Sequence, residues 1–466
     1  MTTSFGARPR AVLASVGTLG LALAAAVSPA SAADATPVTP TQLFNGYQSC
    51  STDSDRPTYL WAGNGLTVEG IPATTDATSN SLVTVQYQVW PVADPTHTTT
   101  VTRPYALPGS EAAANLPADA LPDGQTYAWR AQTVAGGAAS DWSAPCYIAI
   151  DNTRPATTPG ISSPNYPQGA RNQGGSPVEF TLNANGDEDV TGFEYSWQQD
   201  LPIAGYANIG EHGVPQFVDP YADARYFTRA DAPGGSATIS LLPPSGSSGP
   251  MTLWVRGLDR AYNGSAITSY SFFLDSTAPT VTPAVASPVF DKPTTFTFQP
   301  NAGLQSTSPV VSYSVEIVGG QGGDRTIDVA AGPDGTASTK LTLDGIYGES
   351  LRVSSRSANG WVSDAAFWSI TYDTTPTVAS DVYPENASGG GAGVPGTFTL
   401  SPKVKGVASY TYSVNGDPEV TVAAGAHHSA SVDWTPAAAG DYNLTVYATT
   451  RSGIQLAPYY YSFTVN

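Results

Sequence analysis

A recurring phrase, in which a strand-like run ends in Asp and a Pro follows within a few residues, most constrains the fold of this chain. The copies read Tyr147-Ile-Ala-Ile-Asp151 before Pro155, Ser271-Phe-Phe-Leu-Asp275 before Pro279, and Ser369-Ile-Thr-Tyr-Asp373 before Pro376. A further run of this kind, Tyr461-Ser-Phe-Thr-Val-Asn466, closes the sequence. The copies are spaced by roughly 100 residues, the size of a single β-sandwich domain. We call the segment from each of these Asp residues to its Pro a hinge, and the spacing of the hinges predicts β-sandwiches in series.

The rest of the chain has the pattern of short strands. Residues 82–90 and 127–133 alternate apolar with polar side chains, and 46 Gly and 39 Pro punctuate such runs. No segment has a convincing helical period. We predict an all-β chain whose parts are a signal peptide (1–32), a flexible lead (33–40) and four sandwiches (41–151, 152–275, 276–373 and 374–466).

The copies also share internal landmarks. Each later repeat has a Phe-Thr strand, a Tyr-Ser strand and a late strand that begins with Leu, so we expect the members of each set to be equivalent. The three sets are Phe180, Phe296 and Phe398; Tyr195, Tyr313 and Tyr412; and Leu253, Leu351 and Leu444. In the first repeat Tyr127 follows a Pro-Asp-Gly turn, as the residue of a tyrosine corner does.

The first 32 residues have the pattern of a secretory signal. Arg8 and Arg10 precede an apolar stretch over 11–27, and Ala30-Ser31-Ala32 is a small-residue cleavage site. A membrane anchor is the alternative, but the stretch is short for a span and Ser28-Pro29 follows it. We therefore expect a secreted, extracellular chain with no membrane span after cleavage.

Cys50 and Cys146 are the two cysteines, and both fall in the first predicted sandwich. In an exported protein they are expected to form a disulfide. Two free thiols or a metal pair are the alternatives. The formal net charge of −19 argues against a nucleic-acid partner and against docking on anionic lipid.

The first repeat resembles the fibronectin type III-like module of large secreted actinobacterial proteins. Leu121-Pro-Asp-Gly-Gln-Thr-Tyr-Ala-Trp-Arg130, Ser140-Asp-Trp142 and Cys146 carry this resemblance. The later repeats resemble the immunoglobulin-like modules of such proteins, in which a D-x-x-x-P hinge precedes Phe-Thr, Tyr-Ser and D-R-A-x-N strands. Asp259-Arg-Ala-Tyr-Asn263 matches that motif, and Arg356-Ser-Ala-Asn359 and Arg451-Ser-Gly453 are degenerate versions. The resemblance implies tandem immunoglobulin-like and fibronectin type III-like sandwiches, and it implies little about function.

No motif for catalysis is present: the four His lie in no metal-binding pattern, and no nucleophile elbow occurs. The first hypothesis is a non-catalytic interaction or spacer rod at the cell surface or in the matrix. The alternative is recognition of polysaccharide or cell wall through exposed aromatics, and a hydrolase with an unrecognised site is a second alternative. The partner is then an unidentified extracellular protein or polysaccharide, and the oligomeric state stays open.

Six aromatic residues are the candidates for facing a ligand, three of them in the long loop of the second repeat. They are Tyr206, Tyr221, Tyr226, Trp254, Trp361 and Trp434. Packing in a sandwich core is the alternative for each. Long loops on a sandwich are where binding function concentrates.

No cofactor is expected other than calcium, which prefers several oxygen ligands on a loop. The calcium candidates are Asp187, Glu188 and Asp189, or the hinge residues Asp151 and Asp275 with Asp259 and Asn263 nearby. Solvated turns are the alternative, and the hinge carboxylates are also suited to accept backbone N–H groups of the turn that follows.

Overall fold

Over the residues that the structure describes, the regular structure consists of short β-strands, a few short 3-10 turns and one short α-helix, α1 (Ala302–Thr307). The computed structural model describes residues 36–46, 48–76, 81–202, 207–209 and 215–466. The predicted signal peptide and most of the predicted lead lie outside these residues. Among the helices that the structure describes, none is long and apolar enough to cross a membrane.

The strands fall into four groups that share no sheet, and we call them modules 1 to 4. Module 1 pairs the sheet β2-β1-β4-β7 with the sheet β3-β10-β8-β5-β6, and β9 is added at β8. The strands are β1 (Pro37–Asn45), β2 (Gln48–Ser49), β3 (Thr58–Leu60), β4 (Leu66–Thr74), β5 (Val83–Pro91), β6 (Thr99–Ala106), β7 (Ala112–Leu116), β8 (Thr126–Ala135), β9 (Ala138–Ala139) and β10 (Cys146–Ile150).

Module 2 pairs the sheet β11-β13-β18 with the sheet β12-β20-β19-β14-β17, and a separate hairpin, β15-β16, belongs to its long loop. The strands are β11 (Gly160–Ser162), β12 (Arg171–Asn172), β13 (Val178–Asn183), β14 (Gly192–Ser196), β15 (Ala207–Ile209), β16 (Pro215–Phe217), β17 (Phe227–Arg229), β18 (Ser236–Leu241), β19 (Gly249–Leu258) and β20 (Thr268–Leu274).

Modules 3 and 4 repeat the plan with one difference. Module 3 has sheets β21-β22-β25 and β24-β23-β26-β27, and module 4 has β28-β30-β33 and β29-β35-β34-β31-β32. The module 3 strands are β21 (Thr280–Pro283), β22 (Pro293–Gln299), β23 (Val310–Val318), β24 (Arg325–Ala330), β25 (Ala337–Thr342), β26 (Gly348–Ser357) and β27 (Ala366–Thr371). Those of module 4 are β28 (Thr377–Ala379), β29 (Ser388–Gly389), β30 (Gly396–Ser401), β31 (Val407–Val414), β32 (Val420–Ala423), β33 (Ala430–Trp434), β34 (Gly440–Thr450) and β35 (Tyr459–Val465).

Alternation places the apolar side chains of each sheet pair inside. The Phe-Thr landmarks Phe180, Phe296 and Phe398 are all buried, and so are Leu253, Leu351 and Leu444. In module 1 the hydroxyl of Tyr127 donates to the carbonyl of Pro122 at 3.1 Å, which confirms the tyrosine corner. The predicted disulfide between Cys50 and Cys146 is also present.

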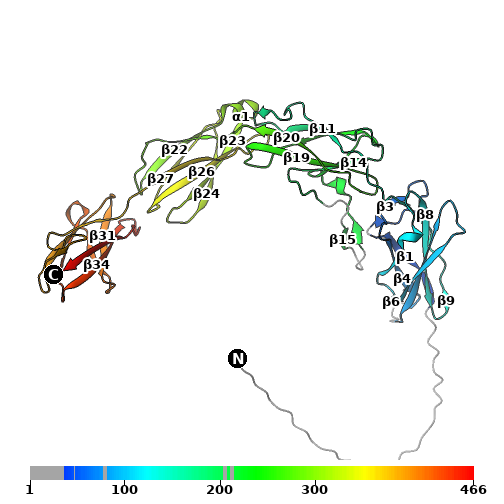
Figure 1. The fold of residues 1–466 in the computed structure, drawn as a ribbon, viewed down its shortest axis with the longest axis horizontal. Coiled ribbons are helices and arrows are strands. Elements are labelled where there is room, and N and C mark those ends of the chain that lie inside the picture. Colours follow the sequence, from blue (N-terminus) through cyan, green and yellow to red (C-terminus); the bar gives the residue numbers. More distant parts are fainter. Residues whose placement is uncertain (1–35, 47, 77–80, 203–206, 210–214) are drawn as a thin grey trace, which may run out of the picture.

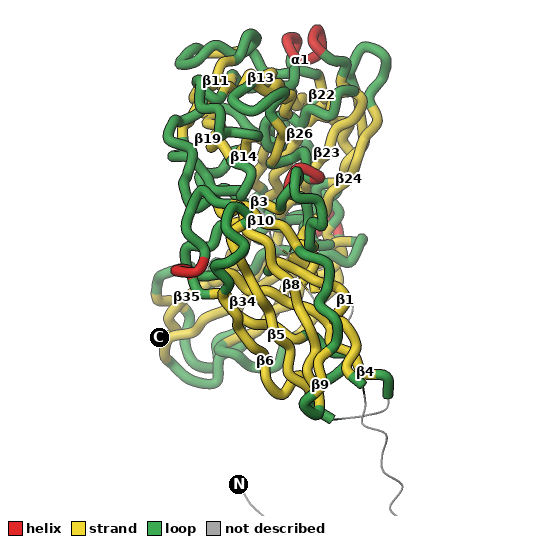
Figure 2. Tube along the Cα trace, turned by 90° about the vertical axis from the view of Figure 1, so that its right-hand side faces the viewer, coloured by secondary structure: helices red, strands yellow, loops and turns green. Residues whose placement is uncertain are grey.

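The modules follow one another in an open arc, with module 1 at one end and module 4 at the other (Figure 1). Seen after a quarter turn, strands dominate the modules, and the helical segments are short pieces in the loops (Figure 2). Modules 2 and 3 share one continuous cluster of buried side chains, whereas modules 1 and 4 have clusters of their own. Inter-module contacts are therefore not alike, and they are the natural place to look for function.

Candidate functional site: the joints and the long loop

One recurring turn, just before the last strand of modules 2, 3 and 4, builds the joints. In each copy a backbone N–H donates to the carbonyl four residues on: Asp259 to Asn263, Ser357 to Trp361, and Thr450 to Ile454. Asn263, Trp361 and Ile454 therefore occupy equivalent positions. Matching Asn263 with Asn359 from the D-R-A-x-N pattern is wrong, because Asn359 lies two residues before the equivalent position.

At the first joint, between modules 1 and 2, this position carries an amide that reaches the preceding hinge. Nδ2 of Asn263 donates to the carbonyl of Asp151 at 2.8 Å. From module 1, the carboxylate of Asp123 accepts the backbone N–H of Asn152 at 2.6 Å and the hydroxyl of Thr153 at 2.8 Å. The hinge is thus bonded to both of its modules. Asp123 belongs to the Pro-Asp-Gly turn before Tyr127, and the sequence did not predict its contact with the hinge.

A second contact crosses the same joint. Arg260, in the turn of module 2, donates from Nη1 to the Tyr59 hydroxyl of β3 at 2.8 Å, and its guanidinium lies 5.0 Å from the centre of that ring. Module 1 and module 2 are therefore joined by polar groups on both sides of the hinge.

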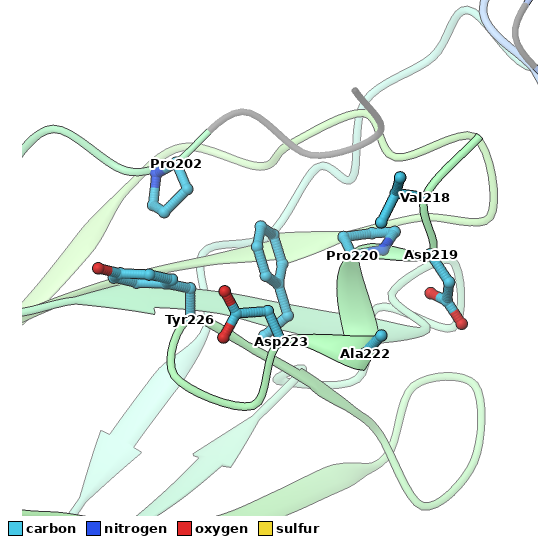
Figure 3. A pocket seen from close by; sticks show the side chains of 8 residues that line it. Pro202, Val218, Asp219, Pro220, Ala222, Asp223 and Tyr226 are labelled. Carbon is cyan, nitrogen blue, oxygen red and sulfur yellow. The ribbon is translucent and has the colours of Figure 1, made fainter. Parts of the chain in front are cut away.

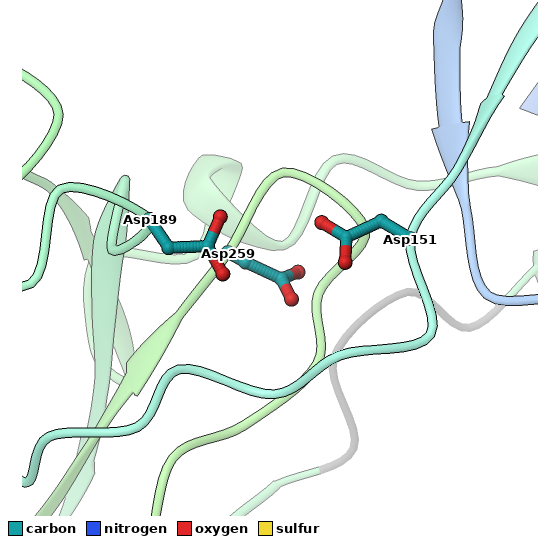
Figure 4. A group of neighbouring side chains, drawn as sticks. All are labelled: Asp151, Asp189 and Asp259. Atoms are coloured by element: carbon teal, nitrogen blue, oxygen red, sulfur yellow. The ribbon is translucent and has the colours of Figure 1, made fainter. Parts of the chain in front are cut away.

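Three carboxylates converge at the first joint. Asp151 from the hinge, Asp189 from the loop between β13 and β14, and Asp259 from the turn have oxygens within 4.8 Å of one another (Figure 4). Burial raises the pKa of Asp259 to about 7, and burial also raises the pKa values of Asp151 and Asp189. The neighbouring acids raise these pKa values further, whereas the Arg260 guanidinium lowers those of Asp151 and Asp189.

The donor set suits a hard cation only in part. The Asp259 carboxylate already accepts three hydrogen bonds, from the backbones of Ala261 and Asn263 and from the Asn263 amide. Asn263 is therefore a hydrogen-bond donor here rather than a metal ligand. Of the three carboxylates in this cluster, only that of Asp189 accepts no hydrogen bond from the residues described here. Carboxylates alone do not define a calcium site.

The other calcium candidates lie apart from this cluster. Asp187 uses its carboxylate to accept the backbone N–H groups of Thr157 and Asp189, and Glu188 is exposed. Asp275 forms an ion pair with Arg171 at 2.8 Å. Of the predicted set, the structure therefore brings together Asp151, Asp189, Asp259 and the Asn263 amide.

At the second joint, between modules 2 and 3, the equivalent position carries Trp361. Its side chain is only 3% exposed, and Nε1 donates to the Thr277 hydroxyl of the hinge at 3.0 Å. The ring lies against Gly174 of module 2, where a Cβ would come within 2.6 Å of it. The prediction that Trp361 faces a ligand is wrong, because the ring fills the space between two modules.

At the third joint, between modules 3 and 4, the hinge is held by a hydroxyl and an ion pair. The Thr374 hydroxyl donates to the Ile346 carbonyl at 2.8 Å and accepts the Ala457 N–H at 3.1 Å. Lys403 contacts the hinge carboxylate of Asp373 at 2.6 Å and lowers its pKa. The hinge carboxylates of the second and third joints are thus paired with cations, whereas that of the first faces two other acids.

The long loop of module 2 forms a mainly apolar pocket of about 540 Å³. Its wall consists of Pro202, Val218, Asp219, Pro220, Ala222, Asp223, Tyr226 and Phe227. Tyr226 and Asp223 lie side by side on this wall (Figure 3). The flanking carboxylates are already paired, Asp223 with Arg225 and Asp219 with Arg229, each at 2.7 Å.

The remaining aromatic candidates are placed unequally. Tyr206 lies outside the described residues, and Trp254 is half-buried on β19. Tyr221 is half-buried beneath the Arg229 guanidinium, which lies 4.2 Å from its ring centre. Trp434 packs edge-on against Tyr442 at 5.1 Å. Only Tyr226 lines the pocket.

Sequence reasoning missed the aromatics that are most exposed. Tyr105, Phe367, Tyr347 and Tyr460 each leave about two thirds or more of the side chain in water, at 79%, 75%, 68% and 67%. They share no motif, and alternation alone cannot tell an open sheet face from a covered one. Of the histidines, His97 pairs with Asp94 at 2.6 Å, His427 and His428 lie on a turn, and His212 lies outside the described residues.

No protein-family model matches the sequence, and no curated protein matches it either. Among solved structures, the tetra-tandem repeat from the extending region of a large adhesion protein aligns at 14% identity over 91% of this chain and 99% of its own, with a TM-score of 0.21. A Ca²⁺-stabilised adhesin that helps an Antarctic bacterium bind ice aligns at 16% identity over 93% and 99%, with a TM-score of 0.21. The FN1–FN3 domains of chicken CNTN1 align at 12% identity over 72% and 98%, with a TM-score of 0.19. At such low identity and TM-score, none of these alignments carries an argument about function.

Proposed function

We propose that this chain is a secreted, non-catalytic spacer whose four modules hold a binding partner at a distance from the surface that carries them. The observation behind this proposal is the recurring joint. Asn263 and Trp361 each place a side-chain donor on the hinge that precedes their own module, and the Ala457 backbone does so in module 4.

A spacer needs joints that limit bending between neighbouring modules. A free Gly- or Ser-rich linker samples many end-to-end distances, whereas a hinge bonded on both sides holds neighbouring modules at one separation. Each bond contributes about 1 kcal/mol net, so several bonds together are needed to limit bending.

Small-angle X-ray scattering of the chain after signal removal tests the spacer. We expect the pair-distance distribution of an elongated, curved particle, with the same maximum dimension at low and high salt. A compact particle, or a dimension that varies as in a flexible chain, contradicts the proposal. Mass spectrometry of the secreted protein, expected to begin at Ala33 without free thiols, tests export.

Polysaccharide recognition is a second candidate, and the pocket beside Tyr226 favours it. The Tyr226 ring offers a stacking surface for a sugar. The Asp223 carboxylate beside it accepts from Arg225 and keeps one acceptor position for a sugar hydroxyl. Co-sedimentation with insoluble polysaccharides and bacterial cell wall is the test. We expect saturable binding that Tyr226→Ala removes and that Tyr105→Ala, on an exposed tyrosine outside the pocket, leaves unchanged. Binding that is equal in the two variants contradicts a site in this pocket.

A further inference from the structure

Module 3 lacks a strand that the other three modules have. In modules 1, 2 and 4 a short parallel strand covers the outer edge of the last strand at its C-terminal end: β3 pairs with three residues of β10, β12 with two of β20, and β29 with two of β35. In module 3 the last strand, β27, pairs with β26 on one side and ends the sheet on the other.

The cause is a shorter connection. β12 and β29 arise from the connections 163–177 and 380–395, which link the first two strands of the smaller sheet in modules 2 and 4. The corresponding connection in module 3 is 284–292, and it forms no strand. Strand β21 lies beside β27 just as β11 lies beside β20, so the place that β12 takes in module 2 has no counterpart strand in module 3.

The register identifies the uncovered backbone groups. Leu253, Leu351 and Leu444 pair with Tyr270, Trp368 and Tyr461, which makes Phe273, Thr371 and Thr464 equivalent. The N–H of Phe273 donates to Ala170 and that of Thr464 to Ala387. Among the described residues, the backbone of Thr371 has no such partner, and the same register turns the N–H groups of Phe367 and Ser369 outward.

Side chains next to this edge are also less covered than their counterparts. Tyr270 and Phe272 in module 2 are each 3% exposed, and Tyr461 and Phe463 in module 4 are each 2% exposed. The equivalent residues of β27, Trp368 and Ile370, are only half-buried. A strand laid along β27 would therefore gain main-chain hydrogen bonds and cover apolar surface.

The composition of β27 does not protect its edge. Natural edge strands are blunted by charges, Pro, bulges or short length. Strand β27 reads Ala-Phe-Trp-Ser-Ile-Thr and has no charge, no Pro and no bulge. At the opposite edge of the same sheet, β24 carries Arg325 and Asp328.

We propose that β27 pairs antiparallel with β27 of a second copy of this chain, joining two sheets into one across a twofold axis. This inference goes beyond the spacer function and does not depend on it. A second copy fits because β27 carries no charge, so two copies meet along it without bringing carboxylates together even though each chain carries a formal charge of −19. An isologous contact needs only a patch that is complementary to itself.

Hydrogen-bonded pairs must join outward-facing residues, and several alignments of two β27 strands do so. The alignment centred on Ser369 is the one that pairs all three outward-facing residues with each other. It places Ser369 opposite Ser369 of the second copy and Phe367 opposite Thr371. Trp368 then lies opposite Ile370, so the two half-buried residues of one copy face those of the other. Asp373 falls opposite Ala365, and no two carboxylates face each other.

Sedimentation velocity of the full chain from about 1 to about 100 µM tests this pairing, since a micromolar Kd is visible in that range. We expect a concentration-dependent dimer. Hydrogen exchange of the Ser369 and Thr371 amides should slow as the dimer fills. A chain that stays monomeric throughout overturns the proposal.

Two variants locate the contact. Ser369→Pro removes an outward N–H that β26 does not use, and Pro is tolerated at such edge positions. Phe367→Lys adds an edge charge, and its matched control is Tyr460→Lys, the equivalent exposed residue on the covered strand β35. We expect Ser369→Pro and Phe367→Lys to weaken dimerisation at least about tenfold, or about 1.4 kcal/mol, and Tyr460→Lys to leave it unchanged.

Circular dichroism and thermal unfolding establish that each variant is folded before it is scored. A dimer that persists in folded Ser369→Pro and Phe367→Lys uses another surface and overturns the proposal. Equal weakening by Tyr460→Lys also overturns it, because the effect would then follow from charge rather than from the open edge.

Discussion

The first and second joints place different side chains at the same position of the same turn. Asn263 reaches the hinge carbonyl of Asp151 through an amide, whereas Trp361 reaches the hydroxyl of Thr277 through its indole and buries a large ring at the same time. The buried clusters of modules 2 and 3 are continuous across the second joint, and those of modules 1 and 2 are separate. The residue at this position of the recurring turn therefore differs in the same way as the joint around it, with an amide at the polar joint and a buried ring at the apolar one.

The hinge carboxylates follow the same division. Asp275 and Asp373 pair with Arg171 and Lys403, whereas Asp151 faces Asp189 and Asp259. At the second and third joints the charge of the hinge carboxylate is therefore already neutralised at pH 7, and no proton or added cation is needed to stabilise it. The stability of the first joint should respond to protons, because three carboxylates lie together there.

The largest expected effect is the loss of the apolar joint. Trp361→Ala removes a buried ring and leaves the Thr277 hydroxyl without its donor, so we expect modules 2 and 3 to lose about 3–5 kcal/mol of unfolding free energy. Urea unfolding should change from one shared transition for these modules to two. Trp61→Ala, on a tryptophan that is 48% exposed, is the control and should leave the transition in place. A Trp361→Ala protein that still unfolds modules 2 and 3 together contradicts the apolar coupling.

The polar joint should lose less. Asn263→Ala removes the bonds to Asp151 and Asp259, and we expect roughly 1–3 kcal/mol because a buried carboxylate also loses a partner. Limited proteolysis should reveal faster cleavage at 151–155. Thr397→Ala, which removes an exposed side-chain bond to Asp433 in module 4, is the control and should not expose the hinge. Unchanged cleavage in Asn263→Ala would show that Asp123 and Arg260 suffice to hold the first joint.

The two kinds of joint should differ in their response to pH. The pKa of Asp259 is raised to about 7, so its folded form binds a proton more tightly than its unfolded form. Its contribution to stability grows as the pH falls from about 7 toward the ordinary value of 3.8. The pKa of Asp373 is lowered by Lys403, so its contribution is present above the ordinary value and is lost as the pH falls below it.

Urea unfolding at pH 5 and pH 7 measures this difference. Asp259→Asn should reduce the gain in stability at pH 5, and Asp373→Asn should not. Glu69 in module 1, whose pKa burial also raises to about 7, should keep its own share of the gain in both variants. Equal gains in the wild type and in Asp259→Asn would contradict a proton-sensitive first joint.

The series of sandwiches could be predicted from the sequence because strand alternation and hinge spacing are local signals. It was harder to predict which strand residues of modules 2, 3 and 4 occupy equivalent positions. Tyr195 and Tyr412 pair with the equivalent residues Val255 and Val446, but Tyr313 pairs with Ser355, two residues away from the equivalent Val353. A shift of two residues keeps every side chain on the same face, so a period of two cannot reveal it.

The joints were predicted least well for a different reason. The contact of Trp361 with Gly174 and that of Asn263 with Asp151 join residues that are distant in the chain, and neither has a local pattern. The same limit applies to the open edge of β27. Its cause is a strand that the connection 284–292 of module 3 does not form, and no local sequence pattern marks that difference.

The smallest expected effect concerns the charge at the first joint itself. Asp189→Asn removes one of three neighbouring carboxylates while its side chain loses no hydrogen bond that the described residues make, so we expect a stabilisation of less than about 1 kcal/mol in the presence of a chelator. Asp187→Asn is the matched control and should destabilise, because that carboxylate accepts two backbone N–H groups. Thermal unfolding of both variants with added calcium then separates repulsion from ligation. A cation held by Asp151, Asp189 and Asp259 would raise the melting temperature of the wild type and not that of Asp189→Asn, whereas equal shifts would leave repulsion as the only role of the cluster.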